Sequence, residues 1–245
     1  MLIRVTNRCT MGCRHCMIDA SSPSGDHMGL DVFEKVLSFA EACRTRVLIV
    51  SGGEPFEHPD IAKILSMCAE FQVRTATVIT VCSNGLFALD DEKLALAEHS
   101  GLIIQVTNDK RYYGRDLWLI KHKFDRPLMC FEDRIQLIVP CRRTKENNIP
   151  ATRISPMCFN LRSAVRTLGF ENGLIALEAN GKYCTPSINI DGGVVAGEAD
   201  TCFRIGDVSM RPSELTGRVR EMRCGRCGLR AHLSGAHRAA IGEQA

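Results

Sequence analysis

Short apolar runs rich in β-branched residues alternate along this chain with segments whose apolar residues recur every three to four positions. The short runs predict strands, and the periodic segments predict amphipathic helices. Strands are expected at residues 2–6, 47–50, 73–81, 102–107 and 134–139, and helices at residues 31–43, 59–71, 90–99 and 116–124. Asp31 is available as an N-cap, and the helix at 59–71 has proline in its first turn. This alternation predicts an α/β fold, a parallel sheet with right-handed crossovers that curves into a partial TIM-like barrel.

The pattern changes after about residue 150. Residues 151–169 are expected to form a loop and a helix, and residues 174–178 a last barrel strand. A β-hairpin is predicted at residues 182–195, with its turn at Asp191, Gly192 and Gly193, and a short helix at residues 212–222. We therefore expect a barrel over residues 1–178 and a small hairpin-plus-helix subdomain over residues 179–245.

Composition narrows the class of protein. A chain of 245 residues with 45% hydrophobic residues can bury the core of one catalytic domain with an appendage. The net charge of +3 does not indicate a nucleic-acid partner. No apolar run reaches membrane-spanning length, and no secretion signal is recognisable at the N-terminus. Thirteen cysteines without an export signal indicate metal binding or catalysis in a reducing compartment, so the cytoplasm is the expected location.

Three cysteines, Cys9, Cys13 and Cys16, lie in the run RCTMGCRHC directly after the first predicted strand. Their spacing places three thiolates on one short loop that can surround a single ion or cluster. A structural zinc site takes four protein ligands, whereas a cubane iron–sulfur cluster can take three thiolates and leave its fourth iron open. The triplet therefore favours an iron–sulfur cluster, with a zinc knuckle as the alternative.

The CxxxCxxC spacing resembles that of the radical S-adenosylmethionine (SAM) superfamily. Two further motifs occur in the order found in that family. Gly52-Gly53-Glu54-Pro55 follows the strand at 47–50 as the family's GGEP motif does, and Ser83-Asn84-Gly85 closes the next strand. The resemblance covers about residues 2–139 and implies a partial (β/α)6 barrel with its active site at the C-terminal ends of the strands.

The resemblance also implies cofactors and residue roles. Cys9, Cys13 and Cys16 would hold a [4Fe-4S] cluster whose open iron binds SAM, and an electron from the cluster would yield a 5′-deoxyadenosyl radical that takes a hydrogen atom from the substrate. The residues assigned to SAM are Gly52, Gly53, Glu54 and Pro55 for the methionyl amine, Ser83 and Asn84 for the carboxylate or ribose, and His15 beside the adenine. Simple turn chemistry explains Ser83-Asn84-Gly85 equally well. An external electron donor similar to flavodoxin or ferredoxin is implied as a partner.

A second set of cysteines lies near the C-terminus. Cys184, Gly197 and Cys202 have the spacing of the first half of the SPASM/twitch motif, and Cys224 and Cys227 would complete a four-thiolate set. The resemblance implies a second, auxiliary [4Fe-4S] cluster in a twitch-type subdomain. A four-cysteine zinc site is the alternative.

The auxiliary cluster determines the reaction that we expect. With four protein thiolates its irons are saturated, so it would accept the electron left on a substrate radical and complete a two-electron oxidation. Small twitch-bearing relatives include dehydrogenases of aminocyclitols, and longer SPASM relatives modify ribosomal peptides. No leader-binding segment precedes Cys9, which favours a small polyol or aminocyclitol-like substrate over a peptide. A non-catalytic scaffold that binds clusters or zinc is a third alternative.

Substrate-side groups are not determined by the sequence. Asp109, Lys110 and Arg166 are candidates for the acid–base residue, and Arg143, Arg153 and Arg162 are further arginines in the same part of the chain. The remaining cysteines are expected to be small buried hydrophobic residues: Cys43, Cys68, Cys82, Cys130, Cys141 and Cys158.

Overall fold

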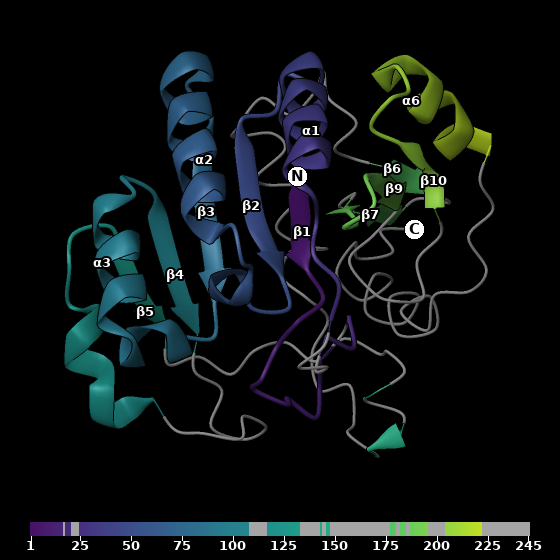
Figure 1. Cartoon of the computed structure of the whole chain (residues 1–245). Helices are drawn as coiled ribbons and strands as arrows, with labels where there is room; N and C mark the ends of the chain where they lie inside the picture. Colours follow the sequence, from purple (N-terminus) through teal and green to yellow (C-terminus); the bar gives the residue numbers. More distant parts are fainter. Residues whose placement is uncertain are drawn as a thin grey trace, which may run out of the picture.

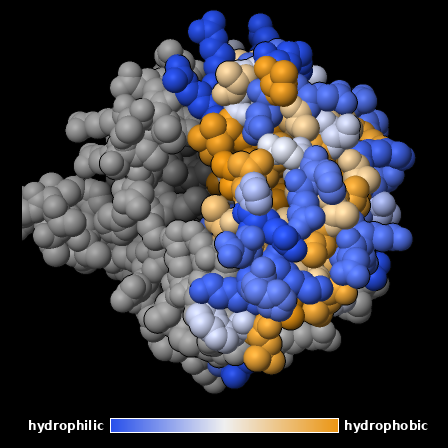
Figure 2. Space-filling view, turned by 90° about the vertical axis from the view of Figure 1, so that its left-hand side faces the viewer, coloured by the Kyte–Doolittle hydropathy of each residue, from blue (hydrophilic) through white to orange (hydrophobic). Residues whose placement is uncertain are grey.

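The computed structural model describes residues 1–16, 18–20, 25–107, 117–132, 143, 146–147, 177–179, 182–184, 187–195 and 204–221. A twisted sheet forms its centre, and helices pack along the sheet's outer face (Figure 1). In the side view of Figure 2, polar residues cover most of the described surface, with apolar residues interspersed. No helix in the described part of the chain is long and apolar enough to cross a membrane.

Eight strands form the main sheet, in the order β10-β9-β8-β1-β2-β3-β4-β5. Their bounds are β1 Leu2–Thr6, β2 Val47–Gly52, β3 Val78–Ser83, β4 Ile103–Thr107, β5 Met129–Glu132, β8 Ser187–Ile188, β9 Gly193–Val195 and β10 Arg204–Asp207. Strands β8 and β1 to β5 pair in parallel, and β9 and β10 are antiparallel. The α/β class and the partial parallel barrel expected from the sequence are confirmed.

The helices lie where the parallel strands need crossovers. Their bounds are α1 Leu30–Ala42, α2 Ile61–Thr75, α3 Asp91–His99 and α6 Pro212–Glu221, with 3-10 helices η1 Pro55–Glu57, η2 Leu86–Leu89 and η3 Trp118–Phe124. Asp90 caps α3 by accepting hydrogen bonds from the backbone N–H groups of Glu92 and Lys93. Each crossover returns the chain to the same edge, so the C-terminal ends of β1 to β4 meet at one side of the sheet.

The period-two alternation of the strands separates two kinds of side chain. In β1, Ile3 and Val5 are fully buried in the core under the helices, whereas Leu2 and Arg4 line a cavity on the other face. In β2, Val50 likewise joins the core while Ser51 faces the cavity. Apolar burial against the helices thus fixes which strand residues face the interior of the barrel.

Several element boundaries differ from the sequence expectation. The strand expected at 73–81 begins only at Val78, because α2 continues to Thr75 and Ala76 then ends it in the left-handed conformation, φ 54°. Asp31 lies in the first turn of α1 and Gly29 is the N-cap, while Pro59 precedes α2. The segment expected as a helix at 116–124 is the 3-10 helix η3. Strand β5 was not anticipated, and residues 134–139 lie outside the described part of the chain.

The hairpin expected at 182–195 is present in its second half, where β8 and β9 pair on either side of the predicted turn. The hairpin also extends the barrel, because β8 pairs in parallel with β1. The last barrel strand expected at 174–178 is wrong in its pairing: β6 (Leu177–Ala179) pairs antiparallel with β7 (Lys182–Cys184) in a separate sheet. Helix α6 matches its expected position. The division into units at residue 178 stays a prediction.

Candidate functional site

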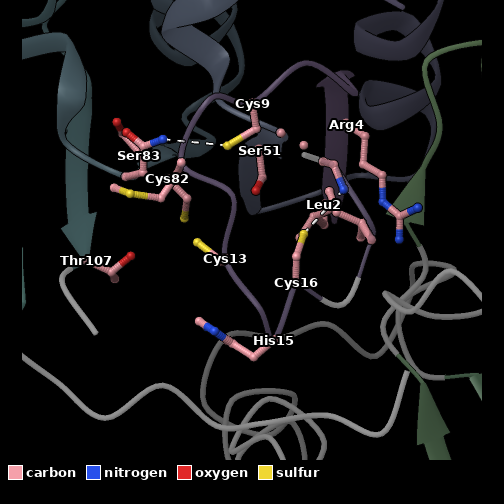
Figure 3. A pocket seen from close by; sticks show the side chains of 16 residues that line it. Leu2, Arg4, Cys9, Cys13, His15, Cys16, Ser51, Cys82, Ser83 and Thr107 are labelled. Atoms are coloured by element: carbon pink, nitrogen blue, oxygen red, sulfur yellow. Dashed lines mark hydrogen bonds between the residues drawn. The ribbon is translucent and has the colours of Figure 1, made fainter. Parts of the chain in front are cut away.

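A cavity of about 200 Å³ lies where the cysteine loop meets the C-terminal ends of β1 to β4 (Figure 3). The loop forms one wall, and the inward-facing strand residues form the others. The described lining residues are Leu2, Arg4, Cys9, Met11, Cys13, His15, Cys16, Ile18, Ala20, Ser51, Gly52, Gly53, Cys82, Ser83, Asn84 and Thr107. The three motifs singled out in the sequence thus contribute to one cavity, at the end of the sheet where parallel α/β folds bind their ligands.

The cysteine loop presents all three thiols to this cavity. Two hydrogen bonds reach its sulfur atoms: the backbone N–H of Ala20 donates to Cys16 Sγ at 3.3 Å, and Asn84 Nδ2 donates to Cys9 Sγ at 3.7 Å. Burial raises the pKa of Cys9 to about 11 and that of Cys13 to about 12. Burial therefore favours the neutral thiol form of Cys9 and Cys13.

The three thiols can be compared with the two groups that the sequence allows, a zinc ion and a [4Fe-4S] cluster. A zinc ion holds its sulfur ligands at about 2.3 Å, which requires the side chains to converge on one point. Among the described residues, no group of three or more His, Cys, Asp or Glu side chains converges closely enough to hold a single metal ion. Three thiols at one cavity, with hydrogen-bond donors to the sulfurs of Cys9 and Cys16, are a donor set that a [4Fe-4S] cluster with one open iron takes.

Gly52 and Gly53 bring β2 against the start of the cysteine loop. The N–H of Gly53 donates to Thr6 O at 2.6 Å, and the N–H of Glu54 donates to Arg8 O at 2.8 Å. A Cβ on Gly53 would lie 2.0 Å from Arg8 O, and one on Gly52 would lie 2.4 Å from Thr6 O. Only glycine permits this backbone approach, which sets the direction in which the chain leaves β1 toward Cys9.

Glu54 and Pro55 lie behind the wall of the cavity, and neither is among its described lining residues. The Glu54 side chain is 1% exposed. Its Oε1 accepts from Ser83 Oγ at 2.8 Å and from the N–H of Phe56 at 3.2 Å, and its Oε2 accepts from the N–H of Asn84 at 2.7 Å. Burial raises the pKa of Glu54 to about 7, against the lowering effect of these donors. Glu54 thus joins the GGEP segment to the turn after β3.

Ser83, Asn84 and His15 lie at the cavity itself. Asn84 Oδ1 accepts from the N–H of Leu86 and Ser83 Oγ accepts from the N–H of Gly85, so both residues also form the turn that begins η2. His15 is buried, 6% exposed, and in Figure 3 its ring lies on the side of the cavity away from Cys9. The contacts of these three residues with SAM stay predictions.

The other expected site residues are beyond the described structure. Asp109, Lys110, Arg166, Cys202, Cys224 and Cys227 all lie outside the described residues, and only the backbone of Cys184 is described, in β7. Arg143 lies beside the cysteine loop, where it pairs with Asp19 and donates to Cys13 O at 3.5 Å.

Four cavity residues with polar or thiol side chains were not expected from the sequence: Arg4, Ser51, Cys82 and Thr107. Arg4 could have been recognised from the sequence as a cavity residue, because it is the one charged residue in the first predicted strand and lies two positions from Leu2. The expectation for the spare cysteines holds for Cys43 and Cys68, which are buried, but is wrong for two others. Cys82 is half-buried at the cavity and Cys130 is exposed, because both occupy strand positions that face away from the helices.

Part of this chain is similar to a known protein family, and its fold is similar to that of solved structures. Residues 3–112 match the family model of the radical SAM superfamily. The chain is similar in structure to BtrN in complex with AdoMet and 2-DOIA, at 13% identity, over 94% of this chain and 88% of that chain, with a TM-score of 0.61. It is also similar to native anSMEcpe with bound AdoMet, at 15% identity, over 90% of this chain and 82% of that chain, with a TM-score of 0.56. Among curated proteins, no sequence matches significantly.

The position of the cysteine loop agrees with this family match. Residues 3–112 are similar to the radical SAM superfamily, and the chain shares its fold with BtrN and anSMEcpe. That family implies a [4Fe-4S] cluster and SAM, and the residues around this cavity fit both.

Proposed function

We propose that this chain is a radical SAM enzyme and that it catalyses a two-electron oxidation of a small polyol or aminocyclitol-like molecule, with an auxiliary [4Fe-4S] cluster as the acceptor of the second electron. The observation that carries the proposal is the meeting of Cys9, Cys13 and Cys16 with Ser83 and Asn84 at one cavity.

Cys9, Cys13 and Cys16 would hold the cluster, and Gly52, Gly53, Ser83 and Asn84 would contact SAM. When bound, the cluster supplies the electron that cleaves SAM to a 5′-deoxyadenosyl radical, which removes a hydrogen atom from the substrate. The protein's own residues would position the cluster, SAM and the substrate, and would exclude water from them. Asn84 donates a hydrogen bond to Cys9 Sγ, and Glu54 fixes Asn84 by accepting from its backbone N–H. Such outer contacts set the orientation and potential of a metal centre.

The oxidative step rests on the second set of cysteines. Cys184, Cys202, Cys224 and Cys227 would ligate an auxiliary cluster with four thiolates, which leaves no iron open for substrate. The twitch-type subdomain over residues 179–245 is part of the same proposal. Its support is the cysteine spacing together with fold similarity to BtrN over nearly the whole chain. An external electron donor similar to flavodoxin or ferredoxin would reduce the first cluster, and the cytoplasm would supply it.

Metal analysis and redox stoichiometry test this function. Anaerobically purified protein is expected to hold about eight irons per chain, since two cubanes of four irons are proposed. One 5′-deoxyadenosine should form per product, and the product mass should be two hydrogens below that of the substrate. About four irons with near-stoichiometric zinc would remove the auxiliary cluster from the proposal. A product isomeric with its substrate would contradict the oxidation, and a peptide product would replace the small-molecule substrate.

A further inference from the structure

A row of polar side chains runs across the interior of the barrel, one from each of the strands β1 to β4. Arg4 of β1 is in register with Ser51 of β2, and Cys82 of β3 is in register with Gln105 of β4. Cys82 Sγ donates to Gln105 Oε1 at 3.7 Å. Parallel strands buried on both faces are usually apolar throughout, so a polar row here indicates a surface that contacts a polar ligand.

Arg4 is the charged member of this row. It is 8% exposed and lines the cavity, and its Nη1 donates to Asn189 Oδ1 at 3.1 Å. Asn189 is itself held by the β8–β9 hairpin, because its N–H donates to Gly193 O at 2.8 Å and its carbonyl accepts from the N–H of Gly192 at 2.9 Å. The guanidinium is therefore placed by β1 and by the hydrogen-bonded turn between β8 and β9, which limits its rotamers.

The charges of the described cavity wall favour one class of ligand. Arg4 is the only lysine or arginine among the described lining residues, and no aspartate or glutamate is among them. A buried guanidinium interacts strongly with carboxylates and phosphates, because its planar N–H donors match two oxygens at once and little water competes. A ligand with an ammonium group would meet no carboxylate among the described lining residues.

Arg4 also lies across the cavity from Ser83, one of the residues assigned to SAM. Figure 3 shows Arg4 on one side of the cavity and Ser83 on the opposite side, with Cys9 and Cys13 between them. Ser51 and Thr107 add hydroxyl groups to the wall. An anionic group bound at Arg4 would therefore leave the rest of a small molecule extended across the cavity, toward the cysteine loop.

We propose that Arg4, positioned by Asn189, binds a carboxylate or phosphate group of the substrate, which makes the substrate an anionic polyol such as a sugar acid or a polyol phosphate. This inference rests on the proposed function and narrows its substrate class. Arg4 acts as a specificity-determining residue, and the hydroxyls of Ser51 and Thr107 hydrogen-bond the polyol.

The test uses four molecules of similar size and different charge: glucose, glucosamine, gluconate and glucose 6-phosphate. Their dissociation constants are measured by anaerobic calorimetry on the reconstituted holoenzyme with saturating SAM, in a buffer without phosphate or carboxylate. At least one anion should bind about tenfold or more tightly than glucose and glucosamine. The stronger of gluconate and glucose 6-phosphate identifies the anionic group as carboxylate or phosphate.

Three variants assign the selectivity. Arg4→Met should weaken binding of the preferred anion at least about tenfold and leave SAM affinity within about twofold. Arg4→Lys keeps the charge without the planar donors, so it should keep part of the preference even where Arg4→Met perturbs the fold. Arg46→Met removes an exposed arginine and should change nothing.

Two outcomes overturn the inference. One is the absence of a preference for anions in the wild-type enzyme, whether all four molecules bind alike or none binds. The other is a tenfold loss of SAM affinity in Arg4→Met with the preference for anions unchanged, which would assign the guanidinium to the SAM carboxylate. A separate experiment tests the proposed function: wild-type enzyme is incubated with dithionite and SAM alone. If no 5′-deoxyadenosine forms, the proposed function fails, whatever the binding measurements give.

Discussion

Glu54 accepts a 2.7 Å hydrogen bond from the backbone N–H of Asn84, and this contact links two motifs that are 30 residues apart in the sequence. The carboxyl group is buried with three donors around it, so it orders the turn after β3. Asn84 in turn donates to Cys9 Sγ. The GGEP segment thus reaches the cysteine loop by two routes, one through the Gly53 backbone and one through Glu54 and Asn84.

Replacement of Cys13 by alanine should abolish reductive cleavage of SAM, because the cluster loses one of its three protein ligands. The iron content should fall by about four per chain. Iron analysis and chromatography of 5′-deoxyadenosine measure the two effects. Cys68→Ala is the matched control, since Cys68 is buried in the core away from the cavity. A Cys13→Ala enzyme that cleaved SAM at the wild-type rate would refute the assignment of the cluster.

Replacement of Cys227 by alanine should separate the two proposed clusters. The N-terminal cluster stays, so 5′-deoxyadenosine still forms, but product formation should fall far below it because the substrate radical has no electron acceptor. The ratio of product to 5′-deoxyadenosine is the readout, together with a loss of about four irons. An unchanged ratio would show that Cys227 holds no auxiliary redox centre.

Replacement of Asn84 by alanine should lower the reduction potential of the N-terminal cluster, because the 3.7 Å donor to Cys9 Sγ no longer stabilises negative charge on the sulfur. A redox titration followed by electron paramagnetic resonance measures the potential. Gln105→Ala removes an amide beside Cys82, which is not an expected ligand, and should leave the potential unchanged. Equal shifts in both variants would contradict a specific role for Asn84.

Replacement of Glu54 by glutamine should change the pH dependence of stability in the cluster-free protein. The folded pKa of about 7 lies above the ordinary value of 4.5, so the folded state binds the proton more tightly than the unfolded state. The stability that the folded state gains from this bound proton is therefore fully present below pH 4.5, and it is lost as the pH rises to about 7.

Urea titrations at several pH values between 4.5 and 7 should show this decline in the wild type and a weaker one in Glu54→Gln. The variant should also be about 1–3 kcal/mol less stable, since a glutamine N–H₂ faces a backbone or hydroxyl donor. Parallel pH profiles for the two proteins would show that Glu54 does not titrate in this range.

Replacement of Gly53 by alanine should displace the cysteine loop, because the new Cβ would lie 2.0 Å from Arg8 O. The expected result is loss of most bound iron and a destabilisation of about 1–3 kcal/mol. Gly101→Ala is the control: its φ of +68° strains the backbone, but no atom lies within 4 Å of the new Cβ. Wild-type iron content in Gly53→Ala would show that the loop does not depend on this contact.

Local patterns determined most of the sheet and the identity of the cysteine loop. The β-branched runs at 2–6, 47–50 and 102–107 are strands because their apolar residues pack under the helices, and a family motif follows each of the first two directly. At residues 73–75 the same local reasoning failed. Val73 is 86% exposed at the end of α2, where continuation of the helix outweighs the β-propensity of one residue.

The sequence by itself indicated the class of protein that residues 3–112 resemble, because three cysteines at fixed spacing and two motifs after strands are features of a few adjacent residues. Only the tertiary structure decided what surrounds the cavity. Arg4 and Asn189 are 185 positions apart and meet because β8 pairs with β1. Cys82 faces the cavity because the register of β3 and β4 turns it away from the helices. Strand pairing and register depend on contacts distant in sequence, and no local pattern contains them.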